Sequence, residues 1–315
     1  MNAAVNKVVS DKLKREFGPM LCALFNDQTV IEIMLNSEGK LWGERLGAIM
    51  QQIGTMDASQ AERLMGTLAA LKKEVLTEKN PRLSCELPQE FMNARFQGSI
   101  PPVVRAPSFA IRKRAVAVFT LNEYVERGIM TTAQKAVIEN AVCERQNILI
   151  AGGTGSGKTT LTNAVVQHIT DACPNDRIVT LEDTRELQCT AKNAEAMLTT
   201  EEVSMTALLK DTLRYRPDRI LVGEVRDGAA LDLLMAWNTG HPGGVCTLHS
   251  NSAESALTRM ELLISKVAVG SMQALIAEAV NLIVYIEKCS GSRRIKEIVR
   301  VLGYDGQRYL IQKVE

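Results

Sequence analysis

A glycine-rich loop in the middle of the chain carries the clearest chemical signature. It reads Gly152-Gly153-Thr154-Gly155-Ser156-Gly157-Lys158-Thr159-Thr160 and follows the apolar run Asn147-Ile148-Leu149-Ile150-Ala151. Glycines at this spacing let successive backbone N–H groups point at phosphate oxygens, and a following helix adds the positive end of its dipole. Lys158 is placed to neutralise the β and γ phosphates, and the Thr159 hydroxyl to hold Mg²⁺. The flanking strand and helix favour a nucleoside triphosphate site over a glycine-rich turn without a ligand.

Acidic and histidine side chains end three further predicted strands. Hydrolysis of a triphosphate needs a carboxylate that activates water and a group that responds to the γ-phosphate. In doubly wound sheets such groups follow the carboxyl ends of neighbouring strands. We therefore predict Glu224 as the general base, Glu182 as the group that orients water or a metal-bound water, and His249 as the γ-phosphate sensor. The alternatives are a solvated acid at Glu224, a loop cap at Glu182 or Asp183, and a structural role for His249.

Arginines supply the second kind of catalytic group, because a guanidinium that reaches the γ-phosphate accelerates phosphoryl transfer. The chain offers five candidates, and the sequence does not choose among them: Arg95, Arg112, Arg214, Arg216 and Arg226.

Composition narrows the class of protein. The chain has 315 residues, which is enough for two domains. Its net charge is +1, so binding to nucleic acid or to anionic lipid would need a local basic patch. No apolar run is long enough to span a bilayer, and the N-terminus is too charged for a signal peptide, which predicts a cytoplasmic protein. The seven scattered cysteines predict neither disulfides nor a zinc site, and His241, Cys246 and His249 lack a fourth ligand at zinc spacing.

Two domains are expected on either side of a linker at residues 116–132. Residues 1–115 are predicted to form a smaller α+β domain, and residues 133–315 an α/β domain whose apolar strands suit a parallel sheet covered on both faces. For the first domain we expect helices at 5–17, 20–24 and 61–76, and strands at 30–35, 40–42, 83–87, 94–97, 103–104 and 108–111.

The second domain is expected to begin with a helix over 133–143, capped by Thr131-Thr132. Strands are predicted at 147–151, 177–182, 219–225, 245–249, 282–287, 296–302 and 308–313, and helices at 159–169, 205–213, 228–237, 253–264 and 273–279.

The first helix has a narrow apolar face made by Val5, Val9, Leu13 and Phe17. Such a face usually packs on its own domain; the alternative is contact with lipid or with a partner.

Four motifs together resemble the secretion ATPase superfamily of type II and type IV secretion, pilus assembly and DNA conjugation. The sequence is most similar to the TrbB-like, conjugal-transfer branch. The motifs are the phosphate loop, Leu181-Glu182-Asp183-Thr184-Arg185-Glu186-Leu187 as the aspartate box, Arg214 to Arg226 as the Walker B region, and Thr239 to Ser250 as the histidine box.

The resemblance implies a RecA-like P-loop ATPase domain preceded by a separate N-terminal domain, in a homo-hexameric ring that holds ATP and Mg²⁺ between the domains. It implies that Arg95 and Arg112 reach the phosphates. It also implies partners among membrane secretion-channel and coupling components, with peripheral association at the inner membrane. The four-cysteine module of many type II members is absent, which favours the type IV branch, and Gly223-Glu224 stands where many unrelated ATPases place Asp.

The leading hypothesis is a cytoplasmic ring motor that hydrolyses ATP to energise conjugative DNA transfer or type IV secretion. A pilus assembly, pilus retraction or type II secretion ATPase is the first alternative. A nucleic-acid motor is less favoured, because aromatic content is only 4% and Arg112-Lys113-Arg114 is the one compact basic cluster. No sequence-specific nucleic-acid binding is expected. The remaining alternatives are a small-molecule kinase and a non-catalytic nucleotide sensor.

Overall fold

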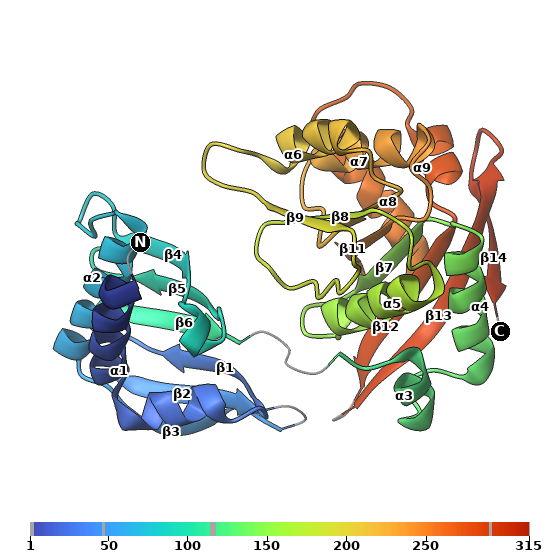
Figure 1. The fold of residues 1–315 in the computed structure, drawn as a ribbon. Helices are drawn as coiled ribbons and strands as arrows, with labels where there is room; N and C mark the ends of the chain where they lie inside the picture. The colour runs from blue at the N-terminus through green and yellow to red at the C-terminus, as the bar shows by residue number, and fades with distance from the viewer. Residues whose placement is uncertain (1–2, 46–47, 114–117, 290–291, 315) are drawn as a thin grey trace. The chain divides into compact units, whose positions relative to one another are not determined.

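The protein divides into two compact units, which we describe separately (Figure 1). The computed structural model describes residues 3–45, 48–113, 118–289 and 292–314, with the backbone alone described for 3–7. The units are Met1–Val116 and Ala117–Glu315.

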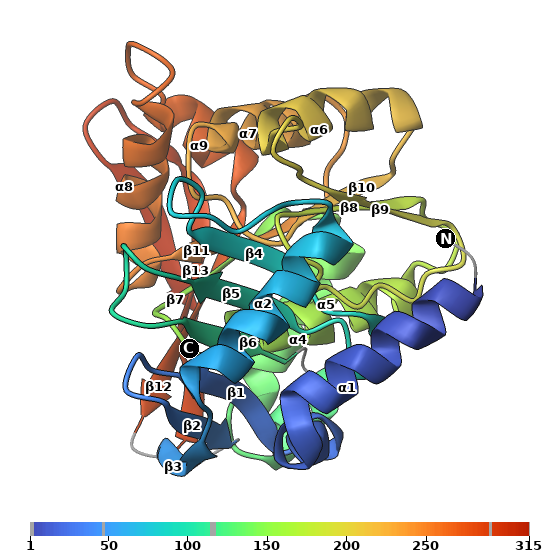
Figure 2. The same ribbon diagram turned by 90° about the vertical axis from the view of Figure 1, so that its left-hand side faces the viewer.

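The first unit is a six-stranded antiparallel sheet with two helices on one face (Figure 2). Its strand order is β3-β2-β1-β6-β5-β4. Three mutually contacting rings, Phe17, Phe25 and Phe91, join the helical layer to the loop after the fourth strand. The elements are α1 (Ala3–Asn26), β1 (Val30–Leu35), β2 (Lys40–Arg45), β3 (Gln51–Thr55), α2 (Ala58–Lys72), β4 (Arg82–Glu86), the 3-10 turn η1 (Gln89–Phe91), β5 (Arg95–Ser99) and β6 (Ser108–Arg112).

The apolar face of α1 packs on its own unit. Leu13 and Phe17 are buried in the core, and Val9 packs against it, as expected from the spacing. The side chain of Val5 lies outside the described residues. Gly18 adopts φ 76° and ψ 167°, so the predicted break at Gly18-Pro19 is a kink after which the helix continues to Asn26.

Other first-unit boundaries differ from expectation. Helix α2 ends at Lys72, because Lys73 turns into the left-handed region, so Val75 and Leu76 lie beyond it. Residues 103–104 are not a strand, and β3 was missed, because the run Gln51–Thr55 has little apolar alternation and lies at the sheet edge.

Lys113, the central residue of the basic cluster Arg112-Lys113-Arg114, has a structural role that the sequence did not indicate. Its buried ammonium donates hydrogen bonds to the carbonyl oxygens of Leu24, at 2.9 Å, and Asp27, at 2.6 Å, where α1 ends. A cation at these carbonyls satisfies the acceptors that a helix leaves unpaired at its C-terminus. The central lysine of the basic cluster is therefore not exposed for nucleic acid; Arg114 lies outside the described residues.

The second unit is a sheet of order β14-β13-β12-β7-β11-β10-β8-β9, parallel from β12 to β9 and antiparallel through β13 and β14. Helices α3, α4 and α5 cover one face, and α6, α7, α8 and α9 the other (Figure 1). The strands are β7 (Ile148–Gly152), β8 (Ile178–Glu182), β9 (Ala194–Leu198), β10 (Arg219–Val222), β11 (Val245–His249), β12 (Leu282–Cys289), β13 (Ser292–Tyr304) and β14 (Tyr309–Val314).

The second-unit helices follow the expected order apart from the additional helix α3, and the α/β class with a mainly parallel sheet is confirmed. They are α3 (Leu121–Glu126), α4 (Thr132–Cys143), α5 (Lys158–Ala172), α6 (Met205–Thr212), the 3-10 turn η2 (Leu213–Tyr215), α7 (Ala229–Asn238), α8 (Ala253–Ile264) and α9 (Gln273–Ala279). Within the part of the chain that the structure describes, no helix is both long and apolar enough to traverse a bilayer.

Three differences bear on the site. The predicted linker contains α3, whose Leu121 and Tyr124 are buried in the core of the second unit. Strand β10 ends at Val222, so Glu224 stands in a loop beyond its carboxyl end. Strands β12 and β13 extend further than expected, and Arg293 of β13 lies against the phosphate loop, as described below.

Candidate functional site

The glycine-rich loop joins the buried strand β7 to the first turn of α5, with its shape set by close packing. A Cβ at Gly152 would stand 2.4 Å from the Ile286 carbonyl oxygen and 2.5 Å from Ser156 Oγ, so no larger residue fits. Gly157 has φ 98°, which an L side chain adopts only with strain. The loop therefore brings its backbone to the positive N-terminal end of α5, as a phosphate cradle requires.

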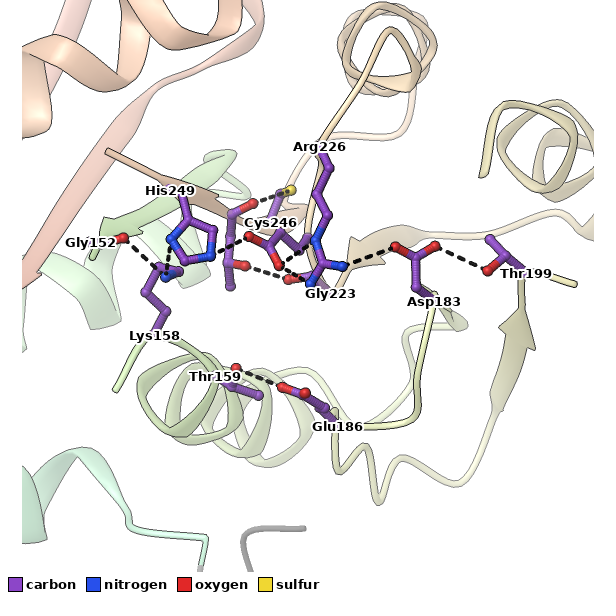
Figure 3. Close-up of polar contacts among 12 residues, drawn as sticks. Gly152, Lys158, Thr159, Asp183, Glu186, Thr199, Gly223, Arg226, Cys246 and His249 are labelled. Carbon is purple, nitrogen blue, oxygen red and sulfur yellow. Dashed lines mark hydrogen bonds and ion pairs between the residues drawn. The ribbon is translucent and has the colours of Figure 1, made fainter. Parts of the chain in front are cut away.

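Lys158 is buried at the mouth of this loop (Figure 3). Its Nζ donates to the carbonyl oxygens of Gly152, at 3.0 Å, and Gly153, at 2.9 Å, and lies 3.2 Å from His249 Nδ1. Strands β7 and β11 are neighbours in register, with His249 opposite Gly152, which explains the contact. The structure thus brings together the predicted lysine and histidine.

Glu224 lies beside this pair and has two different oxygens. Oε2 accepts hydrogen bonds from Arg226 Nε, at 2.8 Å, and Nη2, at 2.5 Å. Oε1 lies 2.9 Å from His249 Nε2, but the contact lacks hydrogen-bond alignment, since this buried oxygen accepts no hydrogen bond within the described residues. Arg226 thus holds one oxygen of Glu224, and the other faces His249 without accepting a hydrogen bond from the described residues.

Backbone contacts hold Glu224 in place. Gly223 N donates to Leu181 O at 2.9 Å, and Thr247 Oγ1 donates to Gly223 O at 2.6 Å. These bonds fix the segment after β10 between its neighbours β8 and β11.

His249 is kept in its neutral form. Burial and the charge of Lys158 lower its pKa, while Glu224 acts in the opposite direction. With Lys158 donating to Nδ1, the ring proton belongs on Nε2, facing Glu224. This histidine therefore couples the loop lysine to the carboxylate.

Glu182, at the end of β8, has different hydrogen-bond partners from Glu224. Its buried carboxylate accepts, through Oε1, the N–H groups of Glu186 and Leu187, both at 2.8 Å. A Cβ at Gly223 would approach Glu182 Cγ to 3.0 Å, so the two strand ends pack closely. Glu182 thus orders the loop that follows it.

Glu186 is the site residue that the sequence reasoning did not single out. Its Oε2 accepts the Thr159 hydroxyl at 2.9 Å (Figure 3). Its place in the aspartate box, four residues after Glu182, was the available signal. Hydroxyl and carboxylate oxygens are the donors that Mg²⁺ prefers, so Thr159 and Glu186 fit the predicted ion better than Glu182 does.

The candidate arginines fall into three places. Arg226 lies in the site, bound to Glu224 and 3.8 Å from Asp183. Arg214 and Arg216 precede β10, at the opposite end of the strand from Glu224. Arg95 and Arg112 pair across β5 and β6 in the first unit. Arg112 Nε also lies 3.8 Å from Glu32 Oε1.

His241, Cys246 and His249 do not converge. His241 precedes β11 and contacts the Ala236 carbonyl at 3.3 Å, Cys246 is buried within the strand, and His249 ends it. From Val245 to His249, strand β11 spans about 13 Å, and His241 lies before its first residue.

Comparison with known proteins shows the family of this chain. The family model described as "Type II/IV secretion system protein" matches residues 31–306. A probable conjugal transfer protein TrbB of Sinorhizobium fredii is 51% identical over 96% of this chain and 92% of its own length. The type IV secretion system protein VirB11 of Bartonella quintana is 30% identical, over 88% and 90% of the two chains.

Among solved structures, the Legionella pneumophila ATPase DotB is similar in fold, with a TM-score of 0.60 and 16% identity over 97% of this chain and 79% of that one. By the extent of the family match and the identity to these relatives, the chain belongs to the type II/IV secretion system protein family.

Proposed function

We propose that this chain is an ATPase that energises conjugative DNA transfer through a type IV secretion system. Membership of the family and the conjugal-transfer name of a relative at 51% identity support the biological role. The arrangement of Lys158, Glu224 and His249 beside the phosphate loop supports hydrolysis.

One observation carries the catalytic assignment. Glu224 Oε1 is buried, accepts no hydrogen bond from the described residues, and lies at the end of a strand two positions from the loop strand. A buried carboxylate oxygen that accepts no hydrogen bond, and whose one close polar contact is His249 at 2.9 Å, is costly unless it has a function, and abstracting a proton from water is the function that fits this place. Arg226 holds the other oxygen and so fixes the direction of Oε1.

The remaining residues have complementary roles. The backbone of the loop and Lys158 bind the phosphates of ATP, and Thr159 with Glu186 would hold Mg²⁺, which neutralises developing charge when bound. Glu182 acts indirectly in this proposal, because it holds the loop that carries Glu186. His249 links Lys158 to Glu224 and is placed to respond to the γ-phosphate.

The assembly is also a proposal. We infer a homo-hexamer in the cytoplasm, at the inner face of the inner membrane, that works with secretion-channel and coupling subunits. Arg95 and Arg112, adjacent on β5 and β6, are the residues of the first unit proposed to reach the phosphates.

Hydrolysis is tested with purified full-length protein and MgATP. We expect phosphate release that depends on Lys158 and is lost in Lys158→Ala, with Lys210→Ala as control because Lys210 lies on α6, away from the loop. Hydrolysis that persists in Lys158→Ala would contradict the assignment. Transfer of the γ-phosphate to another acceptor would identify a kinase instead.

The biological role is tested by cross-linking Glu224→Gln in its native cells and identifying the captured proteins. Conjugation-channel and coupling subunits are expected. Capture of pilus-retraction or type II components would move the protein to another branch. Salt-sensitive stimulation of turnover by single-stranded DNA, with no channel subunit captured, would favour a nucleic-acid motor.

A further inference from the structure

Arg293 lies against the phosphate loop from the side opposite to the catalytic carboxylate. It stands on β13, paired with Lys288 of β12 near the tip of the hairpin. Its Cδ and Nε lie 2.9 and 3.3 Å from the place where a Cβ on Gly157 would stand, so its stem covers that glycine. Strand β7 lies between β12 and β11, which puts Arg293 and His249 on opposite sides of the loop strand.

The guanidinium of Arg293 has no partner within the described residues. Its Nε is buried and makes no hydrogen bond, and no ion pair involves its charge there. The residue as a whole is only partly buried, but a buried N–H without an acceptor loses its water without compensation. An unpaired guanidinium beside a phosphate loop therefore calls for an anionic partner.

The next arginine along the strand provides the contrast. Arg294 donates to Glu287 Oε1 through Nε and approaches it through Nη2, both at 2.8 Å. Lys296 lies 3.0 Å from the other oxygen of Glu287. Glu287 thus pairs with Arg294 and Lys296, whereas the stem of Arg293 lies against the loop.

On the helical side, the structure gives Arg293 one electrostatic neighbour among the described residues, and it is not a carboxylate. Arg293 acts electrostatically on Tyr124 of α3: burial raises the pKa of this tyrosine, and the Arg293 charge lowers it. A buried phenol with a raised pKa stays neutral at physiological pH.

We propose that Arg293 binds the nucleotide held by this loop, through the α and β phosphates. This inference rests on the proposed function. Lys158, His249 and Glu224 mark the γ-phosphate end of the site, on the side of β11 and beyond, whereas Arg293 lies on the side of β12. A guanidinium there contacts the part of the nucleotide that ADP and ATP share, so it contributes to binding both and little to cleavage.

The test measures equilibrium binding of MgADP and MgATP to full-length protein by calorimetry. Arg293→Gln keeps the stem over Gly157 and removes the charge, and Arg294→Gln is the matched control. A hydrogen bond to a charged group typically affects affinity by about tenfold or more. We expect Arg293→Gln to weaken ADP and ATP binding to a similar extent, about tenfold, with kcat at saturating ATP within about threefold of wild type. Arg294→Gln should bind as wild type does.

Each other outcome has a definite meaning. Equal ADP affinity in wild type and a folded Arg293→Gln variant would overturn the proposal, as would a loss confined to ATP. If Arg293→Gln does not fold, Arg293→Lys, which keeps a charge, is compared with Arg293→Met, which keeps only the stem; equal affinity of these two would also overturn it. Failure of wild type to bind either nucleotide would refute the proposed function itself, which keeps the two failures apart.

Discussion

Glu182 ends β8 and Glu224 comes just after β10, its parallel neighbour, yet the protein uses the two carboxylates in opposite ways. Glu182 accepts two backbone N–H groups of the loop that follows it. Glu224 has one oxygen held by Arg226 and another that accepts no hydrogen bond in the described part of the protein. Carboxylates at equivalent strand ends thus differ in function because their oxygens meet different partners.

The difference teaches how the site divides its tasks. Glu182 sets the path of residues 183–187, and through it the position of Glu186 against Thr159. Glu224 retains an oxygen for chemistry. Removing charge while keeping shape should therefore affect the two positions unequally.

The largest effect is expected for Glu224→Gln. An amide cannot accept the proton of water, and loss of a positioned general base costs a factor of about 10² or more in turnover. ATP affinity should stay near that of wild type, since the loop and Lys158 are untouched. Steady-state hydrolysis and ATP binding measure the two effects. Wild-type turnover in this variant would remove Glu224 from the mechanism.

Two variants of Glu182 distinguish the contribution of its charge from that of its hydrogen bonds. Glu182→Gln keeps an oxygen that accepts the N–H groups of Glu186 and Leu187, so we expect near-native thermal stability and a smaller loss of turnover than in Glu224→Gln. Glu182→Ala leaves both donors unpaired and should destabilise the second unit by about 1–3 kcal/mol. Denaturant unfolding and hydrolysis assays test this pair of variants. A Gln variant as inactive as Glu224→Gln would make Glu182 a chemical group as well.

Arg226 sharpens the comparison by testing whether Glu224 needs its clamp. Arg226→Ala releases Oε2 and lets the carboxylate rotate, which should lower turnover by about tenfold with little change in ATP affinity. Arg185→Ala, in the exposed part of the aspartate-box loop, is the control. Equal turnover in the two variants would mean that Arg226 does not position Glu224.

The smallest effect concerns pH and His249. Because its folded-state pKa is lowered, the unfolded chain binds more protons just below pH 6.5, and stability falls as the pH falls through that window. The melting temperature of wild type should therefore decline more steeply between pH 7 and 5 than that of His249→Gln. His241→Gln, at the other end of β11, should follow wild type. Parallel curves for wild type and His249→Gln would refute this coupling.

Much of the architecture followed from local patterns. Thr131 caps α4 with a reciprocal capping box, and the bounds of α8 and α9 match those expected from periodicity. The sequence pattern did not predict the edge strands β3 and β9, because half-exposed edge strands lack the apolar signal that buried strands carry. Helix α3 lies in the predicted linker, because a six-residue helix has too few turns to show a periodic apolar pattern.

The sequence by itself determined the phosphate loop, because its function depends on backbone shape and on glycines at fixed spacing. It also determined which strand ends carry acids and histidine. Only the tertiary structure decided which oxygen of Glu224 stays unpaired, that Glu186 and not Glu182 contacts Thr159, and that Arg293 covers Gly157. These relations join residues from separate strands and loops, so sheet order and side-chain direction set them, and neither is written in local spacing.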